Sequence, residues 1–319
     1  MKTLVTLAFA FTLQLGAREL TQAVWVYPQQ TGPSNPVSNA AARRTMVDNS
    51  AAHGVTDLYV SVYQSTSNLA GRRMYPDADM ADLIQQAHRK RIKIWAAYGA
   101  PDWPSLGCST NSFPMQRMSE VNAYNSAHEE AEFDGVVLDV EPAEPQSTAD
   151  FQNLLSLYQC VRNTLPRRGG ERLGVAVAIR FFWDTVVAFP VGGPQKKVYE
   201  HIIDMELDHV IVMGYRDYAG TACSGSSHNG IICLDEDEIA YADRTAENNM
   251  ILVGLETSDC APGCGANVTF FPQGEGTLYH EAVLVAEHFR ASRAFGGFAV
   301  HRYQDSYLSG LPGWPAGNK

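Results

Sequence analysis

The chain has 319 residues, of which 45% are hydrophobic and 18% are charged. This length and composition allow a large buried core in one α/β domain, and they exclude a disordered or fibrous protein. The formal net charge of -11 would repel phosphate backbones, and no run of Lys and Arg is longer than the HRKR segment at residues 88–91. We therefore expect no nucleic-acid partner.

The N-terminal segment, MKTLVTLAFAFTLQLGA, begins with one Lys, continues as an apolar run and ends in small residues. This pattern is typical of a secretory signal peptide and is too short to span a bilayer stably. We expect cleavage after Ala17 or Ala23, and we assign residues 1–23 to the signal peptide and residues 24–319 to the mature domain. The protein is then secreted and extracellular, without membrane contact after cleavage. An uncleaved N-terminal anchor is the alternative.

Six cysteines fit export, because disulfides form and persist in oxidising compartments. Two pairs are close in sequence and the third is left by elimination, which predicts the bridges Cys223–Cys233, Cys260–Cys264 and Cys108–Cys160, although other pairings remain open. A zinc site is the alternative, but the spacing between the local pairs is poor and no His completes a set. The sequon at Asn267 predicts an exposed loop that is a glycosylation acceptor.

Apolar runs rich in β-branched and aromatic residues predict eight strands, at residues 23–27, 55–63, 91–98, 133–141, 172–181, 209–215, 250–256 and 295–303. Helical periodicity lies between them at residues 80–87, 151–158 and 278–289, and a capping signal at residues 147–150 precedes the second of these helices. This alternation predicts a single (β/α)8 TIM barrel with parallel strands. A doubly wound open sheet is the rival, but the chain has no Gly-rich phosphate loop.

The fourth predicted strand, FDGVVLDVEP, places acidic residues in an apolar run. Because side chains alternate along a strand, Val137, Asp139 and Glu141 share the face that points into the barrel, and the residues between them face the helices. The two carboxylates come at the carboxyl end of the strand, where such barrels place catalytic groups, with Cα atoms roughly 6.6 Å apart. Carboxyls this close do not both ionise easily, so we expect one of them, Glu141, to keep a proton and act as general acid. Asp134, at the start of the strand, is expected to be structural.

The segment DGVVLDVEP resembles the fourth-strand motif of glycoside hydrolase family 18, the chitinase family, usually written DGxDxDxE. Asp139 matches the last Asp of that motif and Glu141 its catalytic Glu, whereas Val137 replaces the inner Asp. The sixth strand, VIVMGYRDYAG, is similar to the family's M-x-Y-D segment through Tyr215, with Arg216 at the Asp position. The closing strand carries His301 where the family has Trp. The resemblance therefore implies distant relatedness.

In that family the Glu protonates the glycosidic oxygen, while Asp and Tyr orient the substrate's own N-acetyl group as nucleophile. The resemblance assigns these roles to Glu141, Asp139 and Tyr215. The seventh strand, VGLETSD, raises an alternative, because it places Glu256 at the same mouth. A strand-four acid with a strand-seven nucleophile is the arrangement of many retaining glycosidases. In both mechanisms Glu141 is the acid, and they differ in whether Glu256 is essential.

Other polar and aromatic side chains near predicted strand ends are candidates for binding sugar faces and hydroxyls. They are Tyr27, Tyr98, Trp103, Arg180, Asp184, Asp217, His301, Tyr303 and Asp305. Each has an ordinary structural interpretation as well. The aromatic rings can simply pack at the rim of the barrel, and Arg180 can form a structural ion pair with Asp139 or Glu141.

Two functions follow from these residues. The first is a secreted glycosidase acting on a polysaccharide or oligosaccharide, with an N-acetylated substrate favoured, and the second is a catalytically silent, lectin-like barrel. The loss of the inner Asp at Val137 favours the lectin, and the retained Glu141 favours the enzyme. The chain contains no G-x-S-x-G motif for a serine hydrolase and no HxH motif for a metal-dependent barrel hydrolase. We expect a monomer without metal or cofactor.

Overall fold

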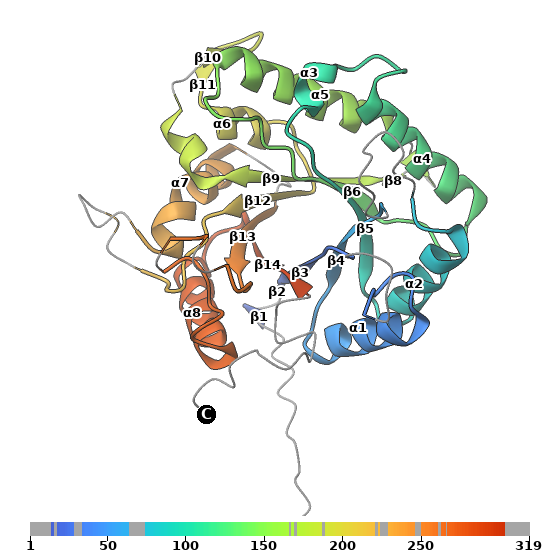
Figure 1. Ribbon diagram of the computed structural model, residues 1–319. Coiled ribbons are helices and arrows are strands. Elements are labelled where there is room, and N and C mark those ends of the chain that lie inside the picture. Colours follow the sequence, from blue (N-terminus) through green and yellow to red (C-terminus); the bar gives the residue numbers. More distant parts are fainter. Residues whose placement is uncertain are drawn as a thin grey trace, which may run out of the picture.

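The computed structural model describes residues 14–15, 18–28, 34–63, 74–165, 167–168, 171–186, 189–220, 223, 229–245, 250–260, 263–265 and 267–303. Eight parallel strands close into a barrel in the order β12-β13-β14-β3-β4-β5-β6-β9. Figure 1 shows these strands in the centre of the molecule with the helices around them. The prediction of a single (β/α)8 TIM barrel is confirmed.

Each predicted strand corresponds to one barrel strand, as follows: β3 Thr21–Val26, β4 Asp57–Ser61, β5 Lys93–Tyr98, β6 Gly135–Leu138, β9 Gly174–Arg180, β12 His209–Met213, β13 Met250–Glu256 and β14 Phe295–His301. The fourth strand is shorter than predicted. Strand β6 ends at Leu138, although Asp139 still donates its backbone N–H to the carbonyl of Tyr98 at 2.8 Å. Asp139 and Glu141 therefore lie in the segment that follows the strand and not in the strand itself.

The helices around the barrel are α1 Ala40–Ala52, α2 Asp77–Arg89, α3 Trp103–Leu106, α4 Phe113–Ala127, α5 Thr148–Thr164, α6 Val198–Ile203, α7 Ile231–Thr245 and α8 Glu275–His288, with a 3-10 helix, η2, at Phe181–Thr185. The three predicted periodicities lie in α2, α5 and α8, and their apolar positions are buried. The predicted capping signal forms a capping box, in which Ser147 accepts from the backbone N–H of Asp150 and Asp150 accepts from that of Ser147.

Short two-residue strands form three antiparallel pairs outside the barrel: β1 Gln14–Leu15 with β2 Arg18–Glu19, β7 Arg167–Arg168 with β8 Glu171–Arg172, and β10 Phe189–Pro190 with β11 Gln195–Lys196. The predicted signal peptide falls largely outside the described residues. Strand β3, however, begins at Thr21, and Ala23 is fully buried within it, opposite Ala299 of β14. The barrel therefore includes residues that precede the predicted start of the mature domain at residue 24.

The core has one layer inside the barrel and one between the strands and the helices. Val137 belongs to the inner layer, whereas Val136 and Leu138 belong to the outer one, as the alternation along the fourth strand predicts. Trp95 fills the inner layer beside Gly135 and Gly174. A Cβ atom on Gly174 would lie 2.5 Å from the Trp95 ring, so this packing requires glycine.

All three predicted disulfides are present. They are Cys108–Cys160, which joins the loop after α3 to α5, Cys223–Cys233 at the beginning of α7, and Cys260–Cys264 in the loop after β13. Within the described part of the chain, no helix is long and apolar enough to cross a membrane. In the same residues, no group of three or more His, Cys, Asp or Glu side chains is placed to hold a metal ion.

Candidate active site

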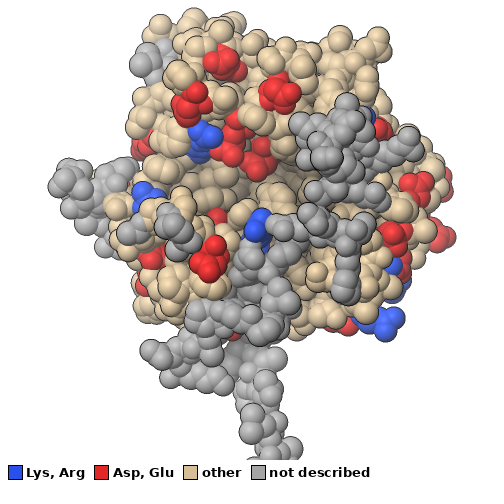
Figure 2. Space-filling model, viewed as in Figure 1, with Lys and Arg blue, Asp and Glu red and all other residues tan. Residues whose placement is uncertain are grey.

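A cavity of about 440 Å³ opens at the carboxyl ends of strands β3, β4, β5, β6 and β9. In Figure 2 acidic and basic side chains gather around a hollow near the centre of the face shown. The cavity is lined by Trp25, Tyr27, Ser61, Ala97, Tyr98, Gly99, Ala100, Pro101, Asp139, Glu141 and Arg180. Five of the predicted site residues, Tyr27, Tyr98, Asp139, Glu141 and Arg180, therefore lie around one cavity at the mouth where the fold places catalytic groups.

Asp139 is one of the two acidic residues that line the cavity. Its Oδ1 atom is buried, and no described residue forms a hydrogen bond with it. Burial, and then the negative charge of Glu141, raises the pKa of Asp139 from 3.8 to about 6, although the positive charges of His301 and Arg180 act in the opposite direction. The sequence argument assigned the retained proton to Glu141. In the structure the raised pKa of Asp139 makes this carboxyl a second group that can keep a proton close to pH 6.

Glu141 forms an ion pair with Arg180, the last residue of β9. Arg180 donates from Nε to Oε2 of Glu141 and from Nη1 to Oε1 of Glu144, the second contact being 2.8 Å long. The guanidinium also lies over the ring of Phe182, 5.5 Å from its centroid. The structural ion pair that the sequence allowed for Arg180 is present, and Oε1 is the oxygen of Glu141 that Arg180 does not engage.

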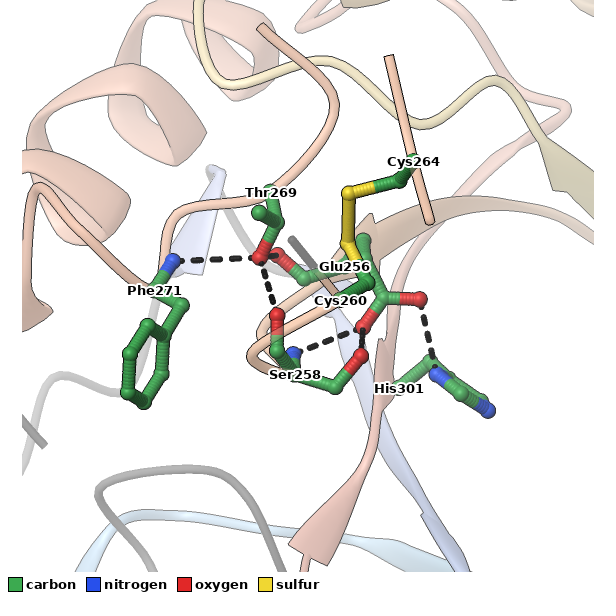
Figure 3. The surroundings of a disulfide bond; sticks show 7 residues. All are labelled: Glu256, Ser258, Cys260, Cys264, Thr269, Phe271 and His301. Carbon is green, nitrogen blue, oxygen red and sulfur yellow. Dashed lines mark hydrogen bonds and ion pairs between the residues drawn. A yellow bond between two sulfur atoms is a disulfide. The ribbon is translucent and has the colours of Figure 1, made fainter. Parts of the chain in front are cut away.

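Glu256, at the end of β13, is held on both carboxylate oxygens (Figure 3). Oε1 accepts from the backbone N–H of Ser258 at 2.7 Å and from its hydroxyl at 2.6 Å, while Oε2 contacts Nδ1 of His301 at 2.8 Å. Burial alone would raise the pKa of Glu256, but the hydrogen bonds and charge of His301 and the bonds from Ser258 outweigh it and lower the pKa below 4.5. Glu256 is therefore a well-oriented carboxylate.

The rings of Tyr27 and Tyr215 both lie close to the His301 ring. The ring centroid of Tyr27 is 5.4 Å from that of His301, and the centroid of Tyr215 is 6.2 Å away. Burial is the main cause that raises the pKa of both hydroxyls, and the charges of Asp139, Glu141 and Glu256 raise them further. Both tyrosines thus keep their protons as hydrogen-bond donors, close to all three carboxyl groups.

Other predicted binding residues lie further from the cavity. Trp103 is 3% exposed and packs behind Tyr98, with ring centroids 5.8 Å apart. Asp217 is buried and accepts a hydrogen bond from Gln273, and Tyr303 is buried in the outer core. None of these three lines the cavity.

Three more candidates from the sequence have other positions. Asp184 lies in η2, and Asp305 lies outside the described residues. Asp134, which was expected to be structural, accepts from the backbone N–H of Ile94 at 2.7 Å and pairs with His88 at 2.9 Å. That expectation is confirmed.

Sequence reasoning missed two residues of this region. Trp25 lines the cavity and stacks on Tyr27 with an interplanar angle of 7°, and Ser258 binds Glu256. Each lies two positions from a residue that the sequence did single out: Trp25 is two positions before Tyr27, and Ser258 is two positions after Glu256. Period-two alternation was the signal that could have found them.

No protein-family model matches the chain, and no curated protein matches it by sequence. Solved structures do match it. YKL-39, determined in the presence of chitooligosaccharides, is 10% identical with a TM-score of 0.56 over 92% of this chain and 96% of that chain.

Two further similar structures are enzymes by their descriptions. A GH113 beta-1,4-mannanase is 10% identical with a TM-score of 0.53, covering 89% of this chain and 88% of that one. A chitinase from Bacteroides thetaiotaomicron is 12% identical with a TM-score of 0.50, covering 89% and 90%. At these identities the likeness establishes the fold, and the chain is a distant structural relative of chitinase-like barrels, as its resemblance in sequence predicted.

Proposed function

We propose that the protein is a secreted glycoside hydrolase that cleaves a polysaccharide or oligosaccharide containing N-acetylated sugars. The observation that carries the proposal is the pair Asp139 and Glu141 in one cavity at the barrel mouth, with the pKa of Asp139 raised to about 6. Two neighbouring carboxyls with different environments provide the acid and the orienting group that glycoside cleavage needs.

In the proposed mechanism Glu141 gives a proton to the glycosidic oxygen as the bond to the anomeric carbon breaks. The carbonyl oxygen of the substrate's acetamido group attacks that carbon, Asp139 accepts a hydrogen bond from the acetamido N–H, and Tyr215 donates one to the carbonyl oxygen. Water then opens the cyclic intermediate and returns the proton to Glu141. The aromatic side chains that line the cavity, Trp25, Tyr27 and Tyr98, would stack on sugar faces.

Export is the second part of the proposal. The three disulfides are of the kind that persists outside the cytosol, and the N-terminal segment has the composition of a signal peptide. Of the two cleavage positions, the one after Ala17 leaves β3 intact, whereas cleavage after Ala23 would remove half of that strand from the barrel. We propose that the mature chain begins at Arg18.

A second candidate is a sugar-binding barrel that does not cleave. Two observations favour it: Arg180 occupies one oxygen of Glu141, and Val137 stands in the inner layer where the related motif has Asp. A retaining mechanism with Glu141 as acid and Glu256 as nucleophile is the alternative among enzymes.

The test is reducing-end release from N-acetylated and non-acetylated polysaccharides by the mature protein and by Glu141→Gln. Glu130→Gln is the matched control, because Glu130 is exposed on the loop that precedes β6, at the opposite end of that strand. We expect release from N-acetylated substrates to be lost in Glu141→Gln and kept in the control. Binding of an N-acetylated oligosaccharide without any release by the wild type would favour the sugar-binding barrel, and equal loss in both variants would contradict the assigned role of Glu141.

A further inference from the structure

Glu256 has an environment unlike that of a nucleophile. Its side chain is only 9% exposed. Three donors, two from Ser258 and one from His301, surround its two oxygens at 2.6 to 2.8 Å. A carboxylate that must form a bond to an anomeric carbon needs one oxygen open to the substrate.

His301 forms a hydrogen bond with Glu256 through its Nδ1 atom. A carboxylate can only accept hydrogen bonds, and the pKa of Glu256 is lowered, so Nδ1 of His301 carries the hydrogen in this contact. The remaining ring nitrogen, Nε2, is then the one available to another partner. The ring lies close to Tyr215 and to Tyr27, which lines the cavity, and the His301 side chain is 24% exposed, so it is more accessible than Glu256.

The loop that carries Ser258 is also held by hydrogen bonds that do not involve the Glu256 carboxylate. The hydroxyl of Thr269 donates to the carbonyl of Ser258 at 2.8 Å and accepts from the backbone N–H of Phe271 at 3.1 Å. The backbone N–H of Cys260 donates to the same carbonyl at 3.0 Å, and the Cys260–Cys264 disulfide closes the loop immediately afterwards (Figure 3). The loop that positions Ser258 beside Glu256 is therefore held by these hydrogen bonds and by the disulfide.

The two strands that carry the pair are also joined beside it. Thr257, next to Glu256, donates from its backbone N–H to the carbonyl of His301 at 2.6 Å and from its hydroxyl at 2.9 Å. These bonds join the ends of strands β13 and β14 where the side chains of Glu256 and His301 contact each other. These bonds hold the backbone beside the contact between Glu256 and His301, and a stable backbone is what an orienting contact requires.

We propose that Ser258 and Glu256 are positioning residues that hold the His301 ring through its Nδ1–H, close to Tyr27 and Tyr215, so that Nε2 faces the bound sugar. The inference rests on the proposed function and deepens it. It assigns to His301 a hydrogen bond with a substrate hydroxyl or acetamido group, and it removes Glu256 from the role of nucleophile. Such a chain of contacts resembles the way a buried carboxylate orients a histidine in other enzymes.

The first experiment does not depend on activity. The ¹⁵N chemical shifts of the histidine rings are measured in the mature protein, and the His301 signals are assigned with His301→Gln. At a pH where the ring is neutral, we expect the Nδ1–H tautomer in the wild type and its loss in Glu256→Gln, whose amide can also donate. The Nε2–H tautomer in the wild type would overturn the proposal. Because no substrate is present, this result stands even if the protein cleaves no glycan.

The second experiment separates positioning from covalent catalysis. Ser258→Ala removes one of the three donors to Glu256, and we expect kcat to fall about 10- to 100-fold with KM little changed, the range for a lost hydrogen bond to a charged group. Ser258→Thr keeps the hydroxyl and is expected to recover most of the rate.

A fluorinated, activated N-acetylglycoside tests whether Glu256 acts as a covalent nucleophile. If Glu256 were the nucleophile, it would accumulate as a covalent glycosyl ester detectable by intact mass and peptide mapping. We expect no adduct on Glu256. An adduct there, or Ser258→Ala with wild-type kcat, would overturn the proposal, whereas absence of cleavage by the wild type would overturn the proposed function alone.

Discussion

Replacing Asp139 by Asn is expected to make the protein more stable at neutral pH while it removes a group of the proposed mechanism. Burial and the charge of Glu141 raise the pKa of Asp139 from 3.8 to about 6. The folded state therefore holds this proton more tightly than the unfolded state does. Stability is highest below the unfolded pKa, falls as the pH rises between the two values, and remains lowered above about pH 6.

The size of the effect follows from the same values. A rise from 3.8 to about 6 corresponds to about 3 kcal/mol, since one pKa unit is about 1.4 kcal/mol. Asn has nearly the same shape and no charge, so Asp139→Asn should escape this loss. The stability of the variant relative to wild type should then rise by about 2–3 kcal/mol between about pH 4 and about pH 7.5.

Urea unfolding followed by tryptophan fluorescence at a series of pH values measures this difference. Glu130→Gln is the control, because it removes an exposed carboxyl outside the cavity, and its stability is expected to follow the wild type closely. A stability difference for Asp139→Asn that stays constant across the pH range would refute the assignment of the raised pKa to Asp139. The same variant should lose activity on N-acetylated substrates.

Three further predictions concern the barrel and its boundaries. Gly174→Ala is expected to destabilise the protein by about 1–3 kcal/mol, because the new Cβ would lie 2.5 Å from the Trp95 ring, and a Trp95→Leu background should reduce that loss in a double-mutant cycle of urea unfolding. Asp235→Asn is expected to stabilise the protein at neutral pH by about 1–3 kcal/mol. Asp235 is fully buried in α7, neither carboxyl oxygen has a hydrogen-bond partner in the described residues, and burial raises its pKa. A variant whose melting temperature equals that of the wild type between about pH 5 and about pH 8 would contradict this. Intact mass of the secreted protein should correspond to a chain beginning at Arg18, and a mass beginning at Val24 would show that the barrel tolerates a shortened β3.

Asp235 and Glu238 also show that burial of carboxyl groups is not confined to the barrel mouth. Both are fully buried on α7. The carboxyl of Asp235 packs closely against Gly214, where an added Cβ atom would lie 2.5 Å from Oδ2 of Asp235. Burial raises the pKa of both. Nothing in the sequence distinguished these residues, because an i, i+3 pair of acids on a helix ordinarily faces solvent.

The order and number of the strands, the faces of the fourth strand and the disulfide pairs could be predicted from the sequence. These features depend on local periodicity and short spacing, and in a barrel each strand pairs with its neighbours in the chain order. Val137 points inward and Val136 outward for the same reason, since a pleated strand alternates whatever surrounds it. The sequence also placed Asp139, Glu141 and Glu256 at the mouth, because that position depends only on where each strand ends.

Tertiary structure alone decided how these groups behave. Arg180 and Glu141 are 39 positions apart and Glu256 and His301 are 45 apart, so no local pattern reveals that the first pair forms an ion pair or that the second is completed by Ser258. The raised pKa of Asp139 likewise depends on the burial of its side chain in the cavity and on the charge of Glu141 beside it. The sequence therefore determined which chemical groups meet at the barrel mouth. Their partners and protonation depend on distances and burial that exist only after the barrel has closed.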